Sequence, residues 1–291
     1  VVEHDPDIIR TAEWIVDIGP RAGKYGGEVV FNGNPEGLTA SGSITGEFLC
    51  KKEKPVFKRK TSDNFFEINN ASANNLKAVS AKIPKGVLTC VTGVAGSGKS
   101  SLIHTCFVKR HPEAIVIDQS PIGKSSRANA ATYMGVFNAI RKEFALETKA
   151  DASLFSFNSK GACPKCKGQG LLSFELHFMD AVKTTCDECE GRRYRSDVLD
   201  LRYQGKNIAD VLDMTINQAY DFFKVAGINR HLHILQEVGL GYIELGQSLS
   251  TFSGGESQRL KIASELKKEG NIYVMDEPTT GLHMSDIDNF Y

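Results

Sequence analysis

A run of glycines that ends in lysine and serine offers the clearest chemistry in this 291-residue chain. Residues 93–100 read Gly-Val-Ala-Gly-Ser-Gly-Lys-Ser and fit the pattern G-x-x-x-x-G-K-S at every position. Glycines allow a backbone to wrap closely around a polyphosphate with its amide hydrogens pointing inward. The lysine would then reach the β and γ phosphates, and the last serine would bind magnesium. The residues predicted to hold the nucleotide here are Gly93, Gly96, Ser97, Gly98, Lys99, Ser100 and Ser101.

An apolar run that ends in two carboxylates supplies a second element of such a site. Residues 272–275 are Ile-Tyr-Val-Met, and Asp276 and Glu277 follow them directly. A buried strand that delivers acids at its carboxyl end suits a metal–phosphate centre. We expect Asp276 to hold magnesium through water, together with Ser100, and Glu277 to polarise the attacking water. Both carboxylates are therefore predicted to be catalytic, in a reaction that depends on positioning and charge stabilisation.

Between these two motifs, the start of a predicted helix carries two glycines that a plain helix does not explain. Ser253 can cap the helix, and Glu256, three residues later, completes a capping box. Gly254 and Gly255 cost helix stability unless a phosphate approaches the backbone there. The apolar positions expected to face the core from this helix are Leu260, Ala263 and Leu266.

Four of the seven cysteines form two C-x-x-C pairs. Cys163 and Cys166 are separated from Cys186 and Cys189 by 19 residues, and glycines follow both pairs. This spacing is typical of a four-cysteine zinc site, and glycines suit the turns of its knuckles. A similar pattern occurs in chaperone zinc domains, so the module alone does not identify a family.

Bulk composition restricts the remaining possibilities. The chain has 35 basic and 35 acidic side chains, so any basic surface for nucleic acid must be local. The sequence contains no run of 18 apolar residues, so it predicts no membrane-spanning helix. The first residues lack both a starting methionine and the layout of a signal peptide, which predicts a piece of a longer protein. In a chain without a secretion signal, the cysteine pattern favours metal binding over disulfides and suggests a reducing cytoplasm.

Short apolar runs and turns predict the elements that must position these motifs. Strand-like runs cover residues 66–68, 76–83 and 87–92, and the third leads into the glycine-rich loop and then a helix over 101–107. A strand, a loop and a helix in that order mark one unit of an α/β fold. The cysteine-rich segment lacks helical periodicity and is predicted to be a small inserted module, whereas residues 207–240 are predicted to be helical.

The motifs together resemble a known family of ATPases. Ser-Gly-Gly-Glu-x-Gln at 253–258 is the hallmark sequence of ATP-binding-cassette proteins, in which it contacts the γ-phosphate of ATP held by an opposing cassette. Gln119 resembles the Q-loop glutamine of that family, which implies a catalytic coupling role. A zinc module between the phosphate loop and the hallmark helix resembles the UvrA family, the ATPases of bacterial nucleotide excision repair. Further stretches that carry this resemblance are 118–123, 131–133, 155–158 and 276–283.

The resemblance implies a fold and a division into domains. We expect an α/β fold with an ABC-type ATPase core, a mixed sheet flanked by helices, and an inserted helical signature domain with the zinc module. The linker is rich in lysine and proline, which favours a solvated connector over an arm that contacts phosphates. The predicted domains are the tail of a first cassette at 1–48, a linker at 49–64, the first part of a second cassette at 65–120, the inserted domain at 121–245 with its zinc module at 160–195, and the signature helix with the acidic strand at 246–291.

The resemblance also implies a function, namely a DNA-binding ATPase that recognises damaged double-stranded DNA. ATP or ADP, Mg²⁺ and Zn²⁺ would be its cofactors, and a second copy of the protein and a UvrB-like excision partner would be its protein partners, with no membrane involved. Backbone contacts would read DNA shape rather than sequence. The implied DNA contacts are Lys124, Arg127 and Arg141, while a solvated face is favoured for Arg192, Arg193 and Arg195.

Three alternatives remain open at this point. A cassette ATPase of another class, for transport or translational rescue, usually lacks an inserted four-cysteine module. A UvrA paralogue that protects against a DNA-binding drug would share every motif above. A structural zinc module with a vestigial nucleotide site is disfavoured because Lys99, Ser100, Asp276 and Glu277 are intact.

Overall fold

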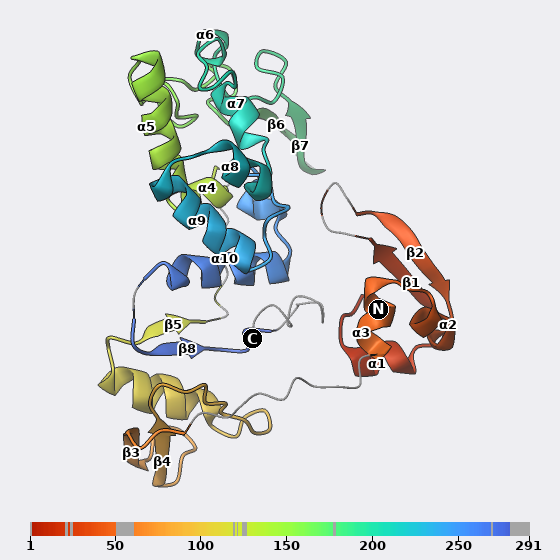
Figure 1. Cartoon of the computed structure of the whole chain (residues 1–291), viewed down its shortest axis with the longest axis vertical. Helices are drawn as coiled ribbons and strands as arrows, with labels where there is room; N and C mark the ends of the chain where they lie inside the picture. Colours follow the sequence, from red (N-terminus) through yellow and green to blue (C-terminus); the bar gives the residue numbers. More distant parts are fainter. Residues whose placement is uncertain are drawn as a thin grey trace. The chain divides into compact units, whose positions relative to one another are not determined.

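The chain divides into two compact units, which are considered separately. The first contains residues 1–50, 117–268 and 276–291, and the second contains residues 51–116 and 269–275. None of the helices in the part of the chain that the structure covers is long and apolar enough to cross a membrane. The structure is a computed structural model, and it describes residues 2–20, 23, 26–50, 61–118, 120, 122–123, 127–176, 179–268 and 270–279 (Figure 1).

The N-terminal part of the first unit is a small α/β segment. Asp5 caps its first helix by accepting hydrogen bonds from the amides of Asp7 and Ile8, and the two strands pair antiparallel with an irregularity after Asp17. Val16 and Ile18 lie on the exposed face of the first strand. The elements are α1 (Pro6–Thr11), β1 (Ile15–Gly19), β2 (Glu28–Gly33), α2 (Pro35–Ala40) and α3 (Ile44–Cys50).

A helical body forms most of the rest of the first unit. Its core contains aromatic side chains that are almost fully buried, among them Phe144, Phe155 and Phe223, and each contributes on the order of 2 kcal/mol by burial. The predicted helical region 207–240 is confirmed. The helices are α4 (Ala130–Tyr133), α5 (Val136–Thr148), α6 (Ser196–Leu199), α7 (Ile208–Leu212), α8 (Ile216–Phe222), α9 (Ala226–Glu237) and α10 (Gly254–Leu266).

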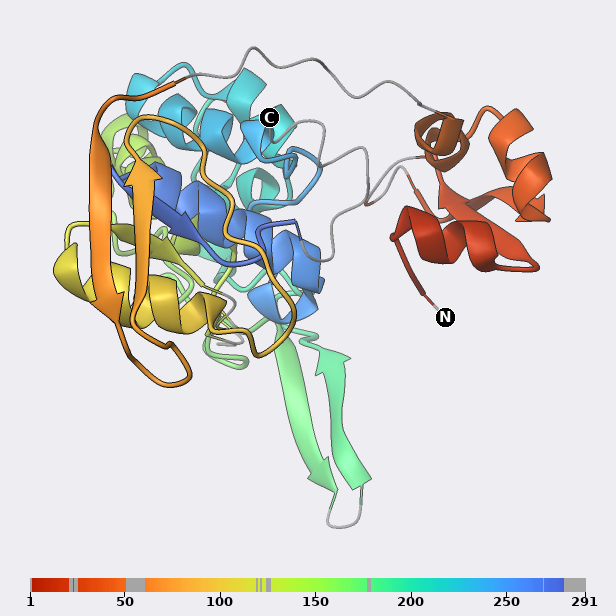
Figure 2. The same ribbon diagram turned by 90° about the horizontal axis from the view of Figure 1, so that it is seen from below.

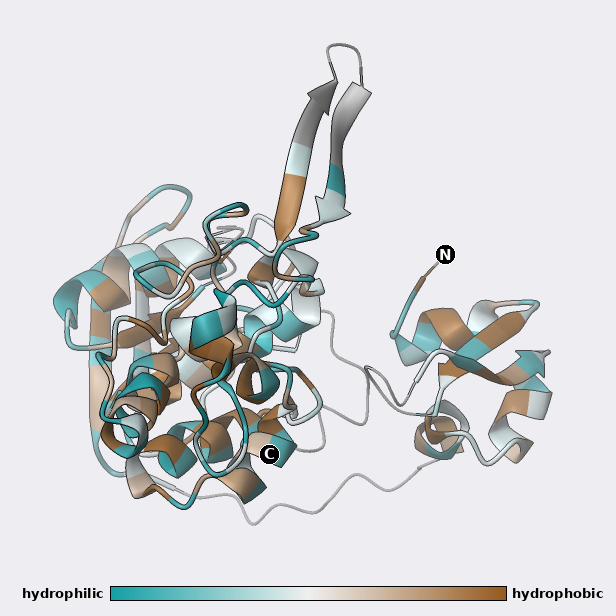
Figure 3. Ribbon diagram, turned by 90° about the horizontal axis from the view of Figure 1, so that it is seen from above, coloured by the Kyte–Doolittle hydropathy of each residue, from teal (hydrophilic) through white to brown (hydrophobic). Residues whose placement is uncertain are grey.

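Helix α9 contacts α5, α8 and α10, and lies between α8 and α10 (Figure 1). It buries Ile228, Leu232 and Leu235, which recur at the spacing of one helix face. The helices carry both hydrophobic and hydrophilic segments, as expected of amphipathic helices at a surface (Figure 3). On α10, Leu260 and Ala263 are buried as predicted. The prediction for Leu266 is wrong: it is 43% exposed, because α10 ends there and leaves the core.

A β-hairpin projects from the helical body between the two cysteine pairs (Figure 2). Its strands are β6 (Leu171–Leu176) and β7 (Met179–Thr185), which pair antiparallel with Leu171 opposite Thr185. The cysteines therefore stand at the base of the hairpin, where both strands join the body.

The second unit contains the glycine-rich loop. Strands β3 (Phe65–Ala71) and β4 (Val79–Pro84) pair antiparallel, and η2 (Ser101–Phe107) packs against β3. The predicted helix 101–107 is confirmed in its bounds, but it is a π-helix, a form often found at functional sites. The short helix η3 (Val108–Arg110) follows it.

The predicted strand at 87–92 is wrong for this structure. The segment forms no strand with any described residue, and Leu88 is 86% exposed. A strand requires a hydrogen-bonding neighbour, and β5 (Ile115–Ile117) pairs instead with β8 (Tyr273–Met275). The apolar run 87–92 has the composition of a strand. Whether it forms one depends on a neighbouring strand, which the sequence pattern does not identify.

Candidate nucleotide site and metal centre

The loop of residues 93–100 encloses a small cavity at the start of η2. Gly93, Gly96 and Gly98 have φ angles of 151°, 76° and 103°. Residues other than glycine rarely adopt φ angles in this region. These glycines therefore set the path of the loop. The cavity has a volume of about 180 Å³ and is lined by Asn75, Gly96, Ser97, Gly98, Lys99, Ser100 and Ser101.

Lys99 lies across this loop. Its Nζ donates hydrogen bonds to the carbonyl oxygens of Gly93 at 2.8 Å and Val94 at 3.1 Å. A phosphate oxygen would be a stronger partner for the ammonium than a neutral carbonyl, because charge-assisted hydrogen bonds are about twice as strong. The donor set of backbone amides, an ammonium and serine hydroxyls fits a polyphosphate.

Sequence reasoning missed two asparagines that hold the loop. Asn75 Nδ2 donates to the carbonyl of Gly96 at 2.7 Å, and Asn74 Nδ2 donates to Ser101 Oγ at 2.9 Å. A Cβ atom at Gly98 would lie 2.9 Å from Asn75 Oδ1, so that amide closes one side of the cavity. The available signal was the Asn-Asn pair between two strand-like runs, which the sequence pattern marks only as a turn.

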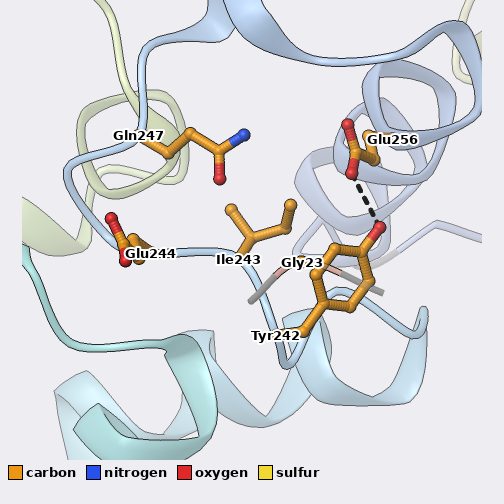
Figure 4. Close-up of a pocket in the computed structure, with 6 residues that line it drawn as sticks. All are labelled: Gly23, Tyr242, Ile243, Glu244, Gln247 and Glu256. Atoms are coloured by element: carbon orange, nitrogen blue, oxygen red, sulfur yellow. Dashed lines mark hydrogen bonds between the residues drawn. The ribbon is translucent and has the colours of Figure 1, made fainter. Parts of the chain in front are cut away.

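The hallmark helix α10 begins with the predicted capping box. Ser253 Oγ accepts from the amide of Glu256 at 3.2 Å, and Glu256 Oε2 accepts from the amide of Ser253 at 2.7 Å. The other carboxylate oxygen of Glu256 accepts from the hydroxyl of Tyr242 at 2.7 Å (Figure 4). Arg259 Nη2 in turn donates to that hydroxyl at 3.3 Å. Tyr242 therefore fixes the glutamate that orients Ser253, a role that its position in the sequence did not reveal.

A shallow cavity lies beside this network. Its volume is about 230 Å³, and the side chains of Tyr242 and Glu256 face one another across a hydrogen bond at its edge (Figure 4). The lining residues are Gly23, Tyr242, Ile243, Glu244, Gln247 and Glu256.

The carboxylates at the end of β8 lie in the same unit as α10. The amide of Asp276 donates to the carbonyl of Ile117, the last residue of β5, at 3.0 Å. Glu277 has a φ of 43°, in the left-handed region that few residues other than glycine adopt. Such strain is concentrated at functional sites.

The structure groups the predicted site residues unequally. The hallmark helix and both carboxylates belong to the first unit, and the glycine-rich loop belongs to the second. The two predicted magnesium ligands, Ser100 and Asp276, belong to different units, and their joint binding of the ion stays a prediction. Gln119 and Lys124 lie outside the described residues.

The two cysteine pairs come together as a buried cluster. The four Sγ atoms lie within 4.8 Å of one another, with Cys163 to Cys186 at 4.0 Å and Cys166 to Cys189 at 3.6 Å. Sulfurs bound to one tetrahedral zinc at about 2.3 Å would be roughly 3.8 Å apart, so the four thiols fit this ion.

The knuckle turns supply backbone donors to the cluster. The amide of Gly170 donates to Cys166 Sγ at 3.2 Å. Burial raises the pKa of Cys189 to about 12, whereas backbone amides lower that of Cys186. A bound cation would favour the thiolate form of all four side chains.

Gly168 shows why the cluster requires glycine. Its φ is 78°, and a Cβ there would lie 1.7 Å from the carbonyl oxygen of Phe157. No side chain can be accommodated without moving the backbone of the helical body. The glycine thus docks the first knuckle against that body.

Comparison with known proteins decides the family. The family model described as "ABC transporter" matches residues 76–280. The chain belongs to the ABC ATPase family. The match also confirms the predicted ABC-type ATPase domain.

Relatives within this family align with 99% of this chain. The "UvrABC system protein A" of Staphylococcus epidermidis is 45% identical over 324 residues, and that of Micrococcus luteus is 47% identical over 325 residues. Each alignment covers 99% of this chain but only 34% and 33% of the relative, so the chain spans about a third of their length. The alignments exceed 291 residues, so these relatives carry residues that this ABC ATPase lacks.

A solved structure agrees with these sequence relatives. UvrA2 from Deinococcus radiodurans matches with a TM-score of 0.89 and 42% identity, over 99% of this chain and 39% of that one. The predicted resemblance to the UvrA family is confirmed, as is the α/β ABC ATPase fold.

Basic side chains of this ABC ATPase differ in how strongly they are engaged. Arg141 Nε donates to the carbonyl of Ala152 at 3.0 Å, and Arg195 pairs with Asp197. Arg193 stacks over Phe157 at 5.3 Å from the ring centre. These contacts show that Arg141, Arg193 and Arg195 interact with neighbouring parts of the protein, and Arg127 is exposed. The predicted DNA contacts stay predictions.

Proposed function

We propose that this chain is the nucleotide-dependent, DNA-binding part of a UvrA-like protein that recognises damaged DNA in nucleotide excision repair. One observation carries the proposal: an intact phosphate loop and a four-cysteine cluster occur in a chain whose similarity to UvrA proteins extends over 99% of its length. Other cassette ATPases usually lack the second feature.

In the proposed reaction, Gly93, Gly96 and Gly98 shape the loop and Lys99 compensates phosphate charge. Glu277 would orient the attacking water, and Asp276 and Ser100 would hold magnesium. Bound Mg²⁺–ATP would supply the phosphoryl group and the charge of the metal. Ser253, held by Glu256, would serve a nucleotide in an opposing cassette, so a second copy of the protein is the proposed partner for hydrolysis.

The cysteine cluster would hold zinc and stiffen the base of the hairpin β6–β7. Stiffness there would fix the direction in which the hairpin leaves the helical body (Figure 2). A hairpin anchored in this way, together with Arg127 and Lys124, is the proposed DNA-contacting region, and the excision partner would act on the DNA that it presents.

A salt titration of DNA binding tests this function. The affinity for a duplex with one bulky lesion and for the same duplex without it would be measured with and without ATP, across a range of salt concentrations. We expect log affinity to fall linearly with log salt, since phosphate contacts release counterions, and the lesion duplex to bind more tightly in at least one nucleotide state. Equal affinity for both duplexes in every state would contradict damage recognition and favour the drug-protection paralogue.

A further inference from the structure

One lysine of the hallmark helix is surrounded by oxygens of the segment that follows β5. Lys261 Nζ donates to Asp118 Oδ1 at 2.6 Å, to the carbonyl of Asp118 at 2.8 Å, to Ser120 Oγ at 2.9 Å and to the carbonyl of Ser120. An ammonium carries three N–H donors, so four acceptors saturate it. The Lys261 side chain is 14% exposed, so this contact is largely shielded from water.

The segment itself is organised around the same carboxylate. Asp118 Oδ1 accepts from the amide of Ser120 at 3.0 Å and from its hydroxyl at 2.6 Å. Hydrogen bonds from Lys261 and Ser120 hold the pKa of the Asp118 carboxyl well below its ordinary value. The carboxylate is therefore ionised at neutral pH, and its contact with Lys261 is a charge-assisted hydrogen bond.

Both ends of this contact lead to proposed nucleotide-site residues. On one side, Ile117 precedes Asp118 and accepts the amide of Asp276. On the other side, Lys261 follows Ser253 by eight residues on α10, about 12 Å along the helix axis. A continuous path of covalent and hydrogen bonds thus joins Asp276 to Ser253 within the first unit, and Lys261 is its side-chain link.

We propose that Lys261 is a positioning residue that couples Asp118 and Ser120 to the hallmark helix, so that nucleotide binding changes the affinity of the inserted domain for DNA. This inference rests on the proposed function, because it requires ATP binding. A rigid helix moves as a body, and a saturated, shielded cation holds its partners tightly. Displacement of the segment by bound nucleotide would therefore be transmitted to α10 and to α9 packed against it.

The test compares Lys261→Met with Lys268→Met, a control on the same helical region. Lys268 lies just beyond α10, is 59% exposed and pairs with Glu265 at 2.6 Å. For each protein we would measure ATP affinity, hydrogen exchange of the amides after β5 without nucleotide, and the ratio of DNA affinities with and without ATP. Asp118→Asn tests the link from the loop side, where the carboxylate is 52% exposed and lies outside the core.

We expect Lys261→Met to bind ATP within about twofold of the unmodified chain. Its amides after β5 should exchange on the order of tenfold faster, and its ratio of DNA affinities should fall from about fivefold or more to about one. Asp118→Asn should change the exchange rate and the ratio of DNA affinities in the same direction as Lys261→Met, and Lys268→Met should change neither. An unchanged ratio in Lys261→Met and Asp118→Asn would overturn the coupling role while leaving the proposed function intact. An unmodified chain that binds no ATP would overturn both.

Discussion

The side-chain amide of Asn75 donates a hydrogen bond of 2.7 Å to the carbonyl oxygen of Gly96, and so joins the turn before β4 to the phosphate loop. Asn75 also lines the cavity that the loop encloses. Its side chain therefore acts on the shape of the loop and on the charge that surrounds a bound phosphate.

Asn75→Ala should weaken ATP binding about fivefold, the equivalent of roughly 1 kcal/mol for one lost hydrogen bond. Asn75→Asp should weaken it further, because it adds a negative charge beside the phosphates, and this additional loss should shrink at high salt. Titration with a fluorescent ATP analogue at low and high salt measures both effects. Equal affinity for the two variants at low salt would show that Asn75 does not face the phosphates.

Gly168→Ala should destabilise the protein more than Gly205→Ala. Both glycines have a φ near 80°, but a Cβ at Gly168 would lie 1.7 Å from a carbonyl oxygen, and a Cβ at Gly205 would meet nothing within 4 Å. The Gly205 variant should lose only the cost of left-handed strain, about 1 kcal/mol or a few degrees of Tm. Calorimetry of both variants separates the cost of the left-handed backbone, which both share, from the cost of the steric clash, which only Gly168→Ala has. Similar Tm values would contradict the docking role assigned to Gly168.

Cys189→Ser should reduce the zinc content of the purified chain, whereas Cys50→Ser should not. The first residue belongs to the buried cluster, and the second is exposed and hydrogen-bonded to the carbonyl of Thr39. We expect one zinc per chain in the unmodified protein, and a lower Tm after chelation, because metal binding contributes to folding. Metal analysis showing no zinc in the unmodified protein, purified without chelator, would contradict the assignment of the cluster.

The sequence predicted local features of the site well, because they depend on neighbouring residues. The capping box of Ser253 and Glu256 and the bounds of the helix at 101–107 are contained in short segments, so neighbouring residue types predict them, although the π-helical form of 101–107 was not predicted. The cysteine cluster was predicted for a related reason, since thiols at this spacing have few other uses in a chain without a secretion signal.

Features that depend on distant partners were missed or predicted wrongly. The contact of Lys261 with Asp118 joins residues 143 positions apart, and no spacing rule identifies it. The run 87–92 has strand composition, but pairing requires a neighbour that composition does not specify. The DNA contact at Arg141, which the resemblance implies, stays a prediction; its hydrogen bond to the carbonyl of Ala152, eleven residues later, was not predicted.

The central claim, that the loop of residues 93–100 binds ATP, is tested most directly by calorimetric titration of Mg²⁺–ATP into the unmodified chain and into Lys99→Ala, with Lys109→Ala as a surface control. Removal of a charge-assisted contact should weaken binding roughly 10- to 100-fold with Tm and zinc content unchanged, and Lys109→Ala should bind like the unmodified chain. Equal affinity of the unmodified chain and Lys99→Ala would contradict the account.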